Sequence, residues 1–509
     1  MQQITQTTRT CGFATSLSRF FVLVVSLTWL AGCVMPVDKT LATPTSGASP
    51  LAAPPSATLF PSYTPAVDET ATPEVTATAA PAAPRSKYSF KVGFDYARHQ
   101  LAVDETVTYF NHSSEPIPNL VLVVEANRSS GVFQLNSVTW VDGTAVSHPT
   151  LKSASLTVAL PHPLQPGNSV TLNLNYQLNL PQRTAILGWD ARQTNLGDWY
   201  PFLPYYQSGT GWLVYSPTGL GEHLAYDIAD YEVEIIPADP KINLVISASA
   251  QSEGDAQTGY RFQLAAARTF AWSASQSMVV LTGTAGNVNL FVTIFPEDKT
   301  AGETALKTMG QAVQTYSDLF GNYDHPSLTM VEANFFDGME YDGLVFLDQN
   351  YFKNYTGSPE GYLVTLSAHE TAHQWWYGLV GNDQAMEPWL DETLATYSEL
   401  LFYQRQYPGE VDWWWNYRVN RFAPKGWVNS TIYDYDAFRP YVNAVYLRGV
   451  QFMQKLREQL GDAVFLAFLK DYATRYRHGW VSGADFFNVL GDHTQLNLDT
   501  LIGDYFKKP

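Results

Sequence analysis

Two histidines four positions apart constrain this chain more than any other feature. They lie in the stretch SAHETAHQWWYGLVGNDQAMEPWLDETLATYSE, residues 367–399, as His369 and His373. On a helix, side chains four positions apart project from one face, so the two imidazoles can hold one metal ion. Glu370 lies between them, beside the open side of such an ion. The alternative is a pair of surface histidines on a helix.

A third metal ligand is predicted from the residues that follow. Gly378 and Gly381 are expected to end the histidine helix, and Pro388 suits the first turn of the next helix. Glu392 lies on that second helix, with eighteen residues between it and His373, where its carboxylate can reach the same ion. Two imidazoles and one carboxylate suit a single Zn²⁺ ion with a fourth position open for water.

Composition narrows the class of partner. With 509 residues, of which 45% are hydrophobic and 14% aromatic, the chain can form two or three packed domains. The formal net charge is −18. Because binding to phosphates needs a basic surface, this charge argues against nucleic acid as a partner. It indicates neither a substrate preference nor an oligomeric state.

Residues 1–32 are typical of an export signal. Arg9 and Arg19 precede an apolar run, FFVLVVSLTWL, which is too short to span a membrane. The run ends in LAGC, which resembles the lipobox of bacterial lipoproteins. This resemblance implies that Cys33 becomes the first mature residue and is lipidated, which would anchor the folded domains on the outer side of the cytoplasmic membrane or at the cell surface. The alternative is an ordinary secretory signal or an anchor helix with a chance cysteine.

The next segment, residues 33–86, is rich in Pro, Thr, Ala and Ser and is expected to be a disordered tether. Period-two alternation then begins, as in YSFKVGFDY and SVTLNLNYQLNL, and recurs to VNLFVTIFP. Residues 87–296 are therefore predicted to form a mainly antiparallel β domain.

The period of the apolar residues changes after Pro296. The segment ETALKTMGQAVQTYSDLFG is predicted to be an amphipathic helix that Gly321 closes. Two short strands, SLTMVEANF and GLVFL, follow, and the spacing is largely helical from there on. Residues 297–509 are thus predicted to form a second domain, with a small sheet and a helical body, in a chain of the α+β class.

The zinc motif resembles that of a known family. The pattern HExxH, eighteen residues and a glutamate in WLDET is similar to the gluzincin metallopeptidases, in particular the aminopeptidase N and leukotriene hydrolase family, whose members read HExxHQW and WLNEG. The matching residues are His369, Glu370, His373, Gln374, Trp375, Trp389, Leu390 and Glu392. The resemblance implies an N-terminal β domain followed by a thermolysin-like, mainly helical zinc-peptidase domain.

A second family element lies upstream. Aminopeptidases of this family carry GAMEN on the edge strand of the catalytic sheet, and this chain has DGMEY. Gly338, Met339 and Glu340 are in register, whereas Asp337 and Tyr341 replace the outer Gly and Asn. The resemblance implies that this segment binds substrate and that Glu340 binds its free α-amine. The alternative is that Glu340 is only a carboxylate in a strand connection.

A third element concerns the oxyanion. In the family, a tyrosine in VYEKG donates a hydrogen bond to the oxyanion that forms during peptide hydrolysis. The stretch AVYLRG has Tyr446 at this position, and Leu447 and Arg448 replace the Glu and Lys of the family. The alternative is a core tyrosine on an amphipathic helix. Three nearby tyrosines compete for the role: Tyr433, Tyr435 and Tyr441.

These parts predict a zinc-dependent aminopeptidase of the cell surface that acts on peptides through a zinc-activated water. Glu370 is expected to act as the general base. Glu399, seven residues after Glu392 and on the same helical face, is predicted to support one of the zinc-binding histidines, although a solvated surface glutamate is an equal alternative.

Two departures from the family pattern leave other functions open. Family members usually continue into a large helical domain, whereas this sequence ends at Pro509, so a more open cleft is expected. The family's second amine-binding carboxylate has no unambiguous counterpart, and Glu222 in GLGEH is only a candidate. A zinc endopeptidase or broader metallohydrolase is therefore the first alternative, and a non-catalytic binding module at the cell surface is the second.

Overall fold

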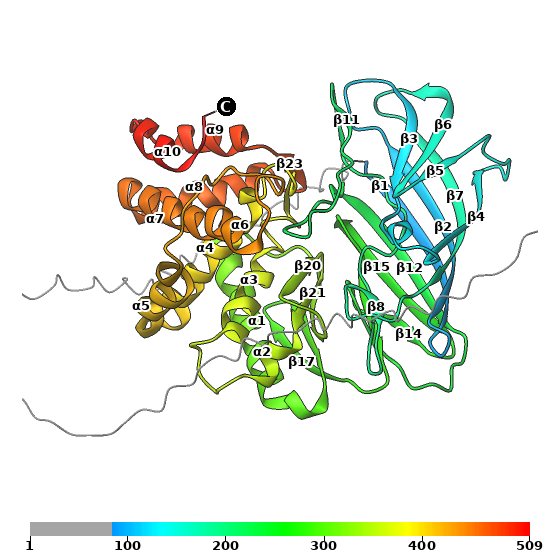
Figure 1. The fold of residues 1–509 in the computed structure, drawn as a ribbon, viewed down its shortest axis with the longest axis horizontal. Helices are drawn as coiled ribbons and strands as arrows, with labels where there is room; N and C mark the ends of the chain where they lie inside the picture. The colour runs from blue at the N-terminus through cyan, green and yellow to red at the C-terminus, as the bar shows by residue number, and fades with distance from the viewer. Residues whose placement is uncertain (1–83, 509) are drawn as a thin grey trace, which may run out of the picture. The chain divides into compact units, whose positions relative to one another are not determined.

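The alternating residues of the N-terminal half form a seven-stranded sheet in the computed structural model, which describes residues 84–508 (Figure 1). The strands, in order across the sheet, are β14 Glu253–Asp255, β15 Gly259–Ala267, β12 Ala229–Pro237, β1 Ser86–Asp95, β2 Gln100–Phe110, β7 Ser169–Asn179 and β4 Phe133–Trp140. Neighbouring strands are antiparallel except for β1 and β12, which are parallel. The prediction of a mainly antiparallel β domain is confirmed.

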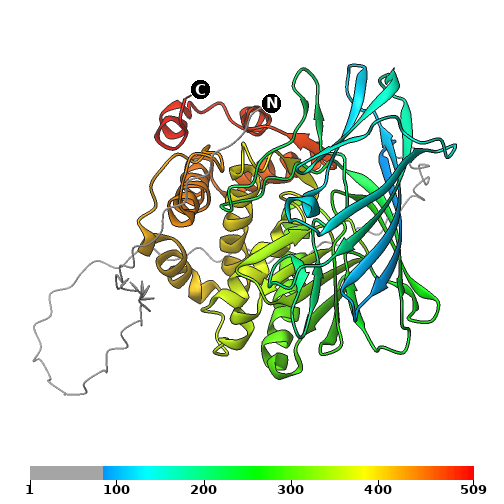
Figure 2. The ribbon, with the colours of Figure 1, turned by 45° about the vertical axis from the view of Figure 1, so that its right-hand side comes forward.

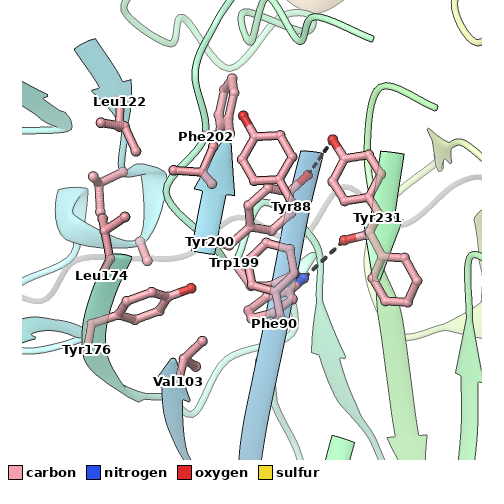
Figure 3. Packing of buried hydrophobic residues seen from close by; sticks show 14 of the residues in the cluster. Tyr88, Phe90, Val103, Leu122, Leu174, Tyr176, Trp199, Tyr200, Phe202 and Tyr231 are labelled. Carbon is pink, nitrogen blue, oxygen red and sulfur yellow. Dashed lines mark hydrogen bonds between the residues drawn. The ribbon is translucent and has the colours of Figure 1, made fainter. Parts of the chain in front are cut away.

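An aromatic core covers one face of this sheet (Figure 3). Tyr88 and Phe90 of β1 pack against Tyr200, with ring centroids 5.8 and 5.0 Å apart. The Tyr200 hydroxyl donates a hydrogen bond to the Tyr231 hydroxyl at 3.2 Å, and Trp199 Nε1 donates to the Phe270 carbonyl at 3.0 Å. Because their polar ends are satisfied, these large rings can be buried without leaving an unpaired donor.

Smaller sheets complete the N-terminal region. A four-stranded sheet contains β13 Val245–Ala248, β16 Trp272–Ser275, β9 Thr194–Leu196 and β8 Leu187–Trp189. A three-stranded sheet contains β3 Ile117–Val123, β6 Ser155–Leu164 and β5 Thr150–Lys152, and a hairpin pairs β10 Tyr206–Gln207 with β11 Gly211–Trp212. One short 3₁₀ helix, Glu125–Arg128, follows β3.

A five-stranded sheet supports the helical half. Its order is β17 Val279–Ala285, β18 Val288–Ile294, β19 Ser327–Ala333, β21 Leu344–Asp348 and β20 Gly338–Tyr341. Residues 279–296 are predicted above to belong to the β domain, but β18 pairs with β19 in parallel and draws β17 into the same sheet. The reason is the connection: parallel neighbours require a crossover, and the helix between β18 and β19 supplies it. The hairpin β17–β18 therefore belongs to the sheet that supports the helical half and not to the seven-stranded sheet.

Helices occupy the side of the structure opposite the seven-stranded sheet in both views (Figures 1 and 2). They are α1 Lys299–Phe320, α2 Gln349–Lys353, α3 Tyr362–Ala372, α4 Trp389–Gln406, α5 Val411–Trp414, α6 Phe438–Val442, α7 Gly449–Leu460, α8 Asp462–Arg475, α9 Gly483–His493 and α10 Asp499–Tyr505. Shorter turns are the 3₁₀ segments Pro296–Asp298, Pro408–Glu410 and Asn420–Phe422 and the π-helical segments Trp415–Val419 and Asn443–Arg448. A parallel pair, β22 Val380–Asn382 and β23 Gly479–Val481, links two loops.

The predicted amphipathic helix is α1, which Gly321 closes with a φ of 110°. Its Tyr316 is fully buried, and the hydroxyl hydrogen bonds both the Ala368 carbonyl of α3 and the Ser398 carbonyl of α4, each at 3.1 Å. One buried side chain thus fixes the two helices that carry the HExxH motif and Glu392 relative to each other.

Three predicted features lie outside the described residues: the signal peptide, the lipidated Cys33 and almost all of the tether. Within residues 84–508, no helix combines the length and the apolar composition needed to cross a lipid bilayer.

Candidate metal centre

Helix α3 carries the first two predicted ligands at its C-terminal end. His369 lies in the last turn, and His373 is the C-cap residue directly after Ala372. The helix therefore ends earlier than the predicted stop at Gly378. After His373 the chain continues in wider turns, in which the Gly378 N–H donates to the His373 carbonyl at 2.9 Å. This path brings the Trp376 carbonyl to 3.0 Å from His373 Nδ1.

The three predicted ligand atoms form a triangle of the size that zinc requires. His369 Nε2 lies 3.1 Å from His373 Nε2, and Glu392 Oε2 lies 3.3 and 3.6 Å from these two nitrogens. Ligand atoms at about 2.0–2.1 Å from a tetrahedral zinc ion are separated by about 3.3 Å. Glu392 is 3% exposed, and its Oε2 has no hydrogen-bond partner among the described residues. Because a buried carboxylate oxygen needs a partner, the donor set fits a zinc ion.

The other nitrogens of the two imidazoles face acceptors. His369 Nδ1 lies 2.9 Å from Glu399 Oε1, so Glu399 occupies the supporting position predicted for it. His373 Nδ1 donates to the Trp376 carbonyl. These contacts place the proton of each ring on Nδ1 and leave the Nε2 lone pairs directed at the metal position.

Glu399 is itself held by residues that the sequence did not reveal. Arg418 donates to both of its oxygens at 2.9 Å, and Trp414 Nε1 donates to Oε2 at 3.0 Å. Burial alone would raise the pKa of Glu399, but the Arg418 charge and the His369 contact hold it below its usual value. No motif marks Arg418, because it follows α5 in a π-helical segment that periodicity does not predict.

Glu370 projects from α3 beside the ligand triangle without belonging to it. It is 5% exposed, and its Oε2 has no hydrogen-bond partner among residues 84–508. A Cβ atom at Gly338 would overlap Glu370 Oε1, so glycine at this position leaves room for the carboxylate. Burial raises the pKa of Glu370 to about 8, while the imidazoles of His369 and His373 act in the opposite direction. A proton-accepting group therefore lies next to the metal position.

Two further carboxylates lie close to the metal position. Glu340 on β20 is 4% exposed and accepts a hydrogen bond from Gln384 Nε2 at 3.2 Å. Glu222, Glu340 and Glu392 each place one oxygen within 4.8 Å of the others. The structure thus brings Glu222 from the β domain to Glu340. Met339 differs from the prediction: it pairs with Phe346 on the apolar side of the sheet and lies outside the cavity lining, because neighbouring residues of a strand face opposite sides.

Tyr446 lies beside the metal-binding His369. It lies in the π-helical segment, lines the cavity, and its ring is 6.3 Å from that of His369 at an interplanar angle of 9°. The three competing tyrosines are absent from the cavity lining within the described chain. Burial raises the pKa of Tyr446, and the Glu392 charge adds to this effect, so the phenol remains a hydrogen-bond donor at neutral pH.

Gln374, the residue after the HExxH motif, fixes the edge strand β20 close to the C-terminal end of α3. Gln374 Nε2 donates to the Tyr341 carbonyl at 3.1 Å, and its Oε1 accepts from the Gly343 N–H at 2.9 Å. These bonds hold the turn between β20 and β21, so they set the position of Glu340 relative to His373. The cavity between these elements has a volume of about 510 Å³.

Part of this chain resembles known proteins in sequence. Residues 304–505 match the Peptidase family M1 domain. The chain is 26% identical over 219 residues to the human thyrotropin-releasing hormone-degrading ectoenzyme, covering 39% of this chain and 20% of that protein. It is 23% identical over 240 residues to a probable aminopeptidase 2 of Sulfurisphaera tokodaii, covering 44% and 30%, and 28% identical over 225 residues to aminopeptidase N of Lactobacillus helveticus, covering 40% and 26%. The chain thus spans between 20% and 30% of the length of these relatives.

A solved structure resembles a larger part of the chain. The crystal structure of an M1 zinc metallopeptidase from Deinococcus radiodurans superposes with a TM-score of 0.60 at 18% identity. It covers 83% of this chain and 94% of the other, which extends the similarity in fold to the β domain.

Proposed function

We propose that this chain, whose residues 304–505 match the Peptidase family M1 domain, is a zinc-dependent aminopeptidase that removes N-terminal residues from peptides. One observation carries the proposal. The zinc-sized triangle of His369, His373 and Glu392 lies in the same cavity as Glu370, Glu340 and Glu222. A general base and an ammonium-binding pair therefore lie beside the metal position.

The chemistry can be assigned to individual groups. A bound zinc ion supplies Lewis acidity, which polarises the scissile carbonyl and lowers the pKa of a bound water. The Glu370 carboxylate accepts the proton of the attacking water and transfers it to the leaving amine. The Tyr446 hydroxyl donates a hydrogen bond to the developing oxyanion. His369 is held in its orientation by Glu399.

The carboxylate pair supports exopeptidase action. A free α-ammonium is a cation with several N–H donors, and Glu340 and Glu222 present acceptors close to each other. Gln384 fixes one oxygen of Glu340, so the carboxylate is oriented before the peptide binds. An acetylated N-terminus would leave both carboxylates without a cation, which disfavours peptides with blocked ends.

The substitution Glu340→Gln tests the exopeptidase assignment. It keeps the side-chain size but removes the charge, so KM for an amino-acid amide should rise while zinc content stays at the wild-type level. Glu370→Gln is the companion variant: it should bind zinc and lose turnover. An internally quenched peptide with both ends blocked tests the endopeptidase alternative. Cleavage of that peptide as fast as of free peptides, or unchanged activity of Glu370→Gln, would refute the assignment.

We also propose that the chain is an exported lipoprotein anchored through acylated Cys33. The LAGC stretch and the preceding apolar run support this proposal. In a bacterial host, the wild-type chain should sediment with membranes and carry a lipid on its N-terminal peptide by mass spectrometry, whereas Cys33→Ser should lose that lipid. A wild-type chain without lipid and with a different N-terminus would contradict the proposal.

A further inference from the structure

Asp337 is a cavity residue that the assignments above do not use. It precedes Gly338, the first residue of β20, and replaces the first glycine of the family sequence GAMEN. Its φ of 69° lies in the left-handed region, which glycine adopts freely and aspartate tolerates. The side chain thus occupies a position where the family pattern has none, and it lines the same cavity as Glu370.

The direction of a bound peptide follows from the positions of two glutamates. Glu340 is assigned to the α-amine of the first residue, and Glu370 to the leaving amine of the second. Gly338 lies directly against Glu370, so the start of β20 is on the leaving side. At about 3.3 Å per strand residue, Asp337 lies about 10 Å along the strand from Glu340. The second residue of a peptide that lies along this strand is about 3 Å further from Glu340 than the first, which leaves about 7 Å to Asp337, a distance that the extended side chain of lysine or arginine can span.

Asp337 has no ion-pair partner within the described residues, and burial raises its pKa, although the Arg418 charge lowers it to a smaller extent. Its Oδ1 accepts a hydrogen bond from the Tyr351 hydroxyl at 3.0 Å, and within residues 84–508 it forms no ion pair. Arg418 also lines the cavity, but its Nε and Nη2 donate to Glu399, and it forms no hydrogen bond or ion pair with Asp337 within the described residues. Arg439 is another lining residue, and its guanidinium lies 4.2 Å from the Phe422 ring, which is not part of the lining.

Apolar groups lie next to this carboxylate. Phe336 is 73% exposed, and its ring centroid is 6.0 Å from that of Phe438. Both residues line the cavity. The site therefore combines a negative group with two aromatic rings, which matches a long side chain with an apolar stem and a cationic end.

We propose that Asp337 is a specificity-determining residue that favours lysine or arginine as the second residue of the peptide substrate. The inference rests on the proposed aminopeptidase function, because that function sets the direction of the peptide. A charge-assisted hydrogen bond in a partly exposed site corresponds to a preference of about tenfold in kcat/KM.

Two tripeptides of equal length test the preference in the full wild-type chain. Ala-Lys-Ala carries the cation, and the same peptide with an acetylated lysine side chain lacks it. We expect kcat/KM to be about tenfold higher for the first peptide, and the ratio to fall as NaCl rises from about 0.05 to about 0.5 M. A ratio near one at low salt would overturn the inference without any variant.

Asp337→Asn tests the residue itself, because it keeps the size and removes the charge. The ratio should fall toward one in this variant. Asp412→Asn is the matched control: Asp412 is an exposed carboxylate on α5 outside the cavity lining, and its replacement should leave the ratio unchanged. A wild-type ratio retained in a zinc-loaded Asp337→Asn chain would overturn the assignment.

Hydrolysis of alanine p-nitroanilide by the wild-type chain separates this inference from the proposed function. This substrate has no second residue, so its cleavage depends only on aminopeptidase activity. Cleavage of the anilide together with a tripeptide ratio of one would refute the role of Asp337 alone. No cleavage of the anilide or of either tripeptide by the zinc-loaded chain would refute the aminopeptidase function and, with it, this inference.

Discussion

Replacing Arg418 with methionine is expected to destabilise the folded chain by about 3 kcal/mol, because it leaves a buried carboxylate without its counter-ion. Glu399 is 0% exposed and receives hydrogen bonds from Arg418 at 2.9 Å on both oxygens. The remaining contacts, with Trp414 and His369, do not replace the lost charge. Loss of a group that supports a metal-binding histidine typically weakens metal affinity 10- to 100-fold.

The assay is urea unfolding of the zinc-free chain, combined with competition for zinc against a chelator of known affinity. The double variant Arg418→Met, Glu399→Gln is the control: it removes both charges and should recover a large part of the stability lost in the single variant. A single variant within about 0.5 kcal/mol of the wild type, or a double variant less stable than the single one, would refute the reasoning.

Three further predictions concern other parts of the chain. Burial raises the pKa of Glu105 well above 4.5, so the folded state holds its proton more tightly than the unfolded state, and this group's contribution to stability falls as pH rises from about 4.5. In urea unfolding, the free energy of unfolding of Glu105→Gln minus that of the wild type should therefore increase as pH rises from about 4.5 to about 8. The same difference at both pH values would contradict this. Gln374→Leu leaves the Tyr341 carbonyl and the Gly343 N–H unpaired, which should lower the free energy of unfolding by about 2–4 kcal/mol. Because β20 is then held less firmly, KM for amino-acid amides should rise. An unchanged KM would contradict a role of β20 in substrate binding. Removal of zinc should lower Tm, and re-addition of zinc to 100 times its Kd should restore about 2.7 kcal/mol; a Tm independent of zinc would argue against a bound ion.

The zinc centre could be predicted from the sequence because its geometry is local. His369 and His373 share a helix face, and a single tight connection brings Glu392 alongside, so spacing alone defines the triangle. Strands such as β1 and β7 could likewise be predicted, because apolar and polar residues alternate along them. Glu399 could be predicted to face the same centre, since it follows Glu392 by two helical turns on α4.

The features that the sequence did not reveal depend on tertiary structure. The hairpin β17–β18 alternates like the strands before it, and only its pairing with β19 shows which sheet it joins. The π-helical segment around Tyr446 follows no periodicity that a sequence pattern detects. Arg418 and Gln384 reach Glu399 and Glu340 from loops and irregular turns, so no spacing relates them to the motif.

In the proposed function, one zinc ion, Glu370 and the Glu340–Glu222 pair act together on the free N-terminus of a peptide. The most direct measurement is the cleavage rate of the purified, zinc-quantified chain on a peptide and on its N-acetylated form. We expect one zinc ion per chain, cleavage of the free peptide and very slow cleavage of the acetylated one. Equal rates on the two peptides, or full activity in a chain without zinc, would contradict the proposed function.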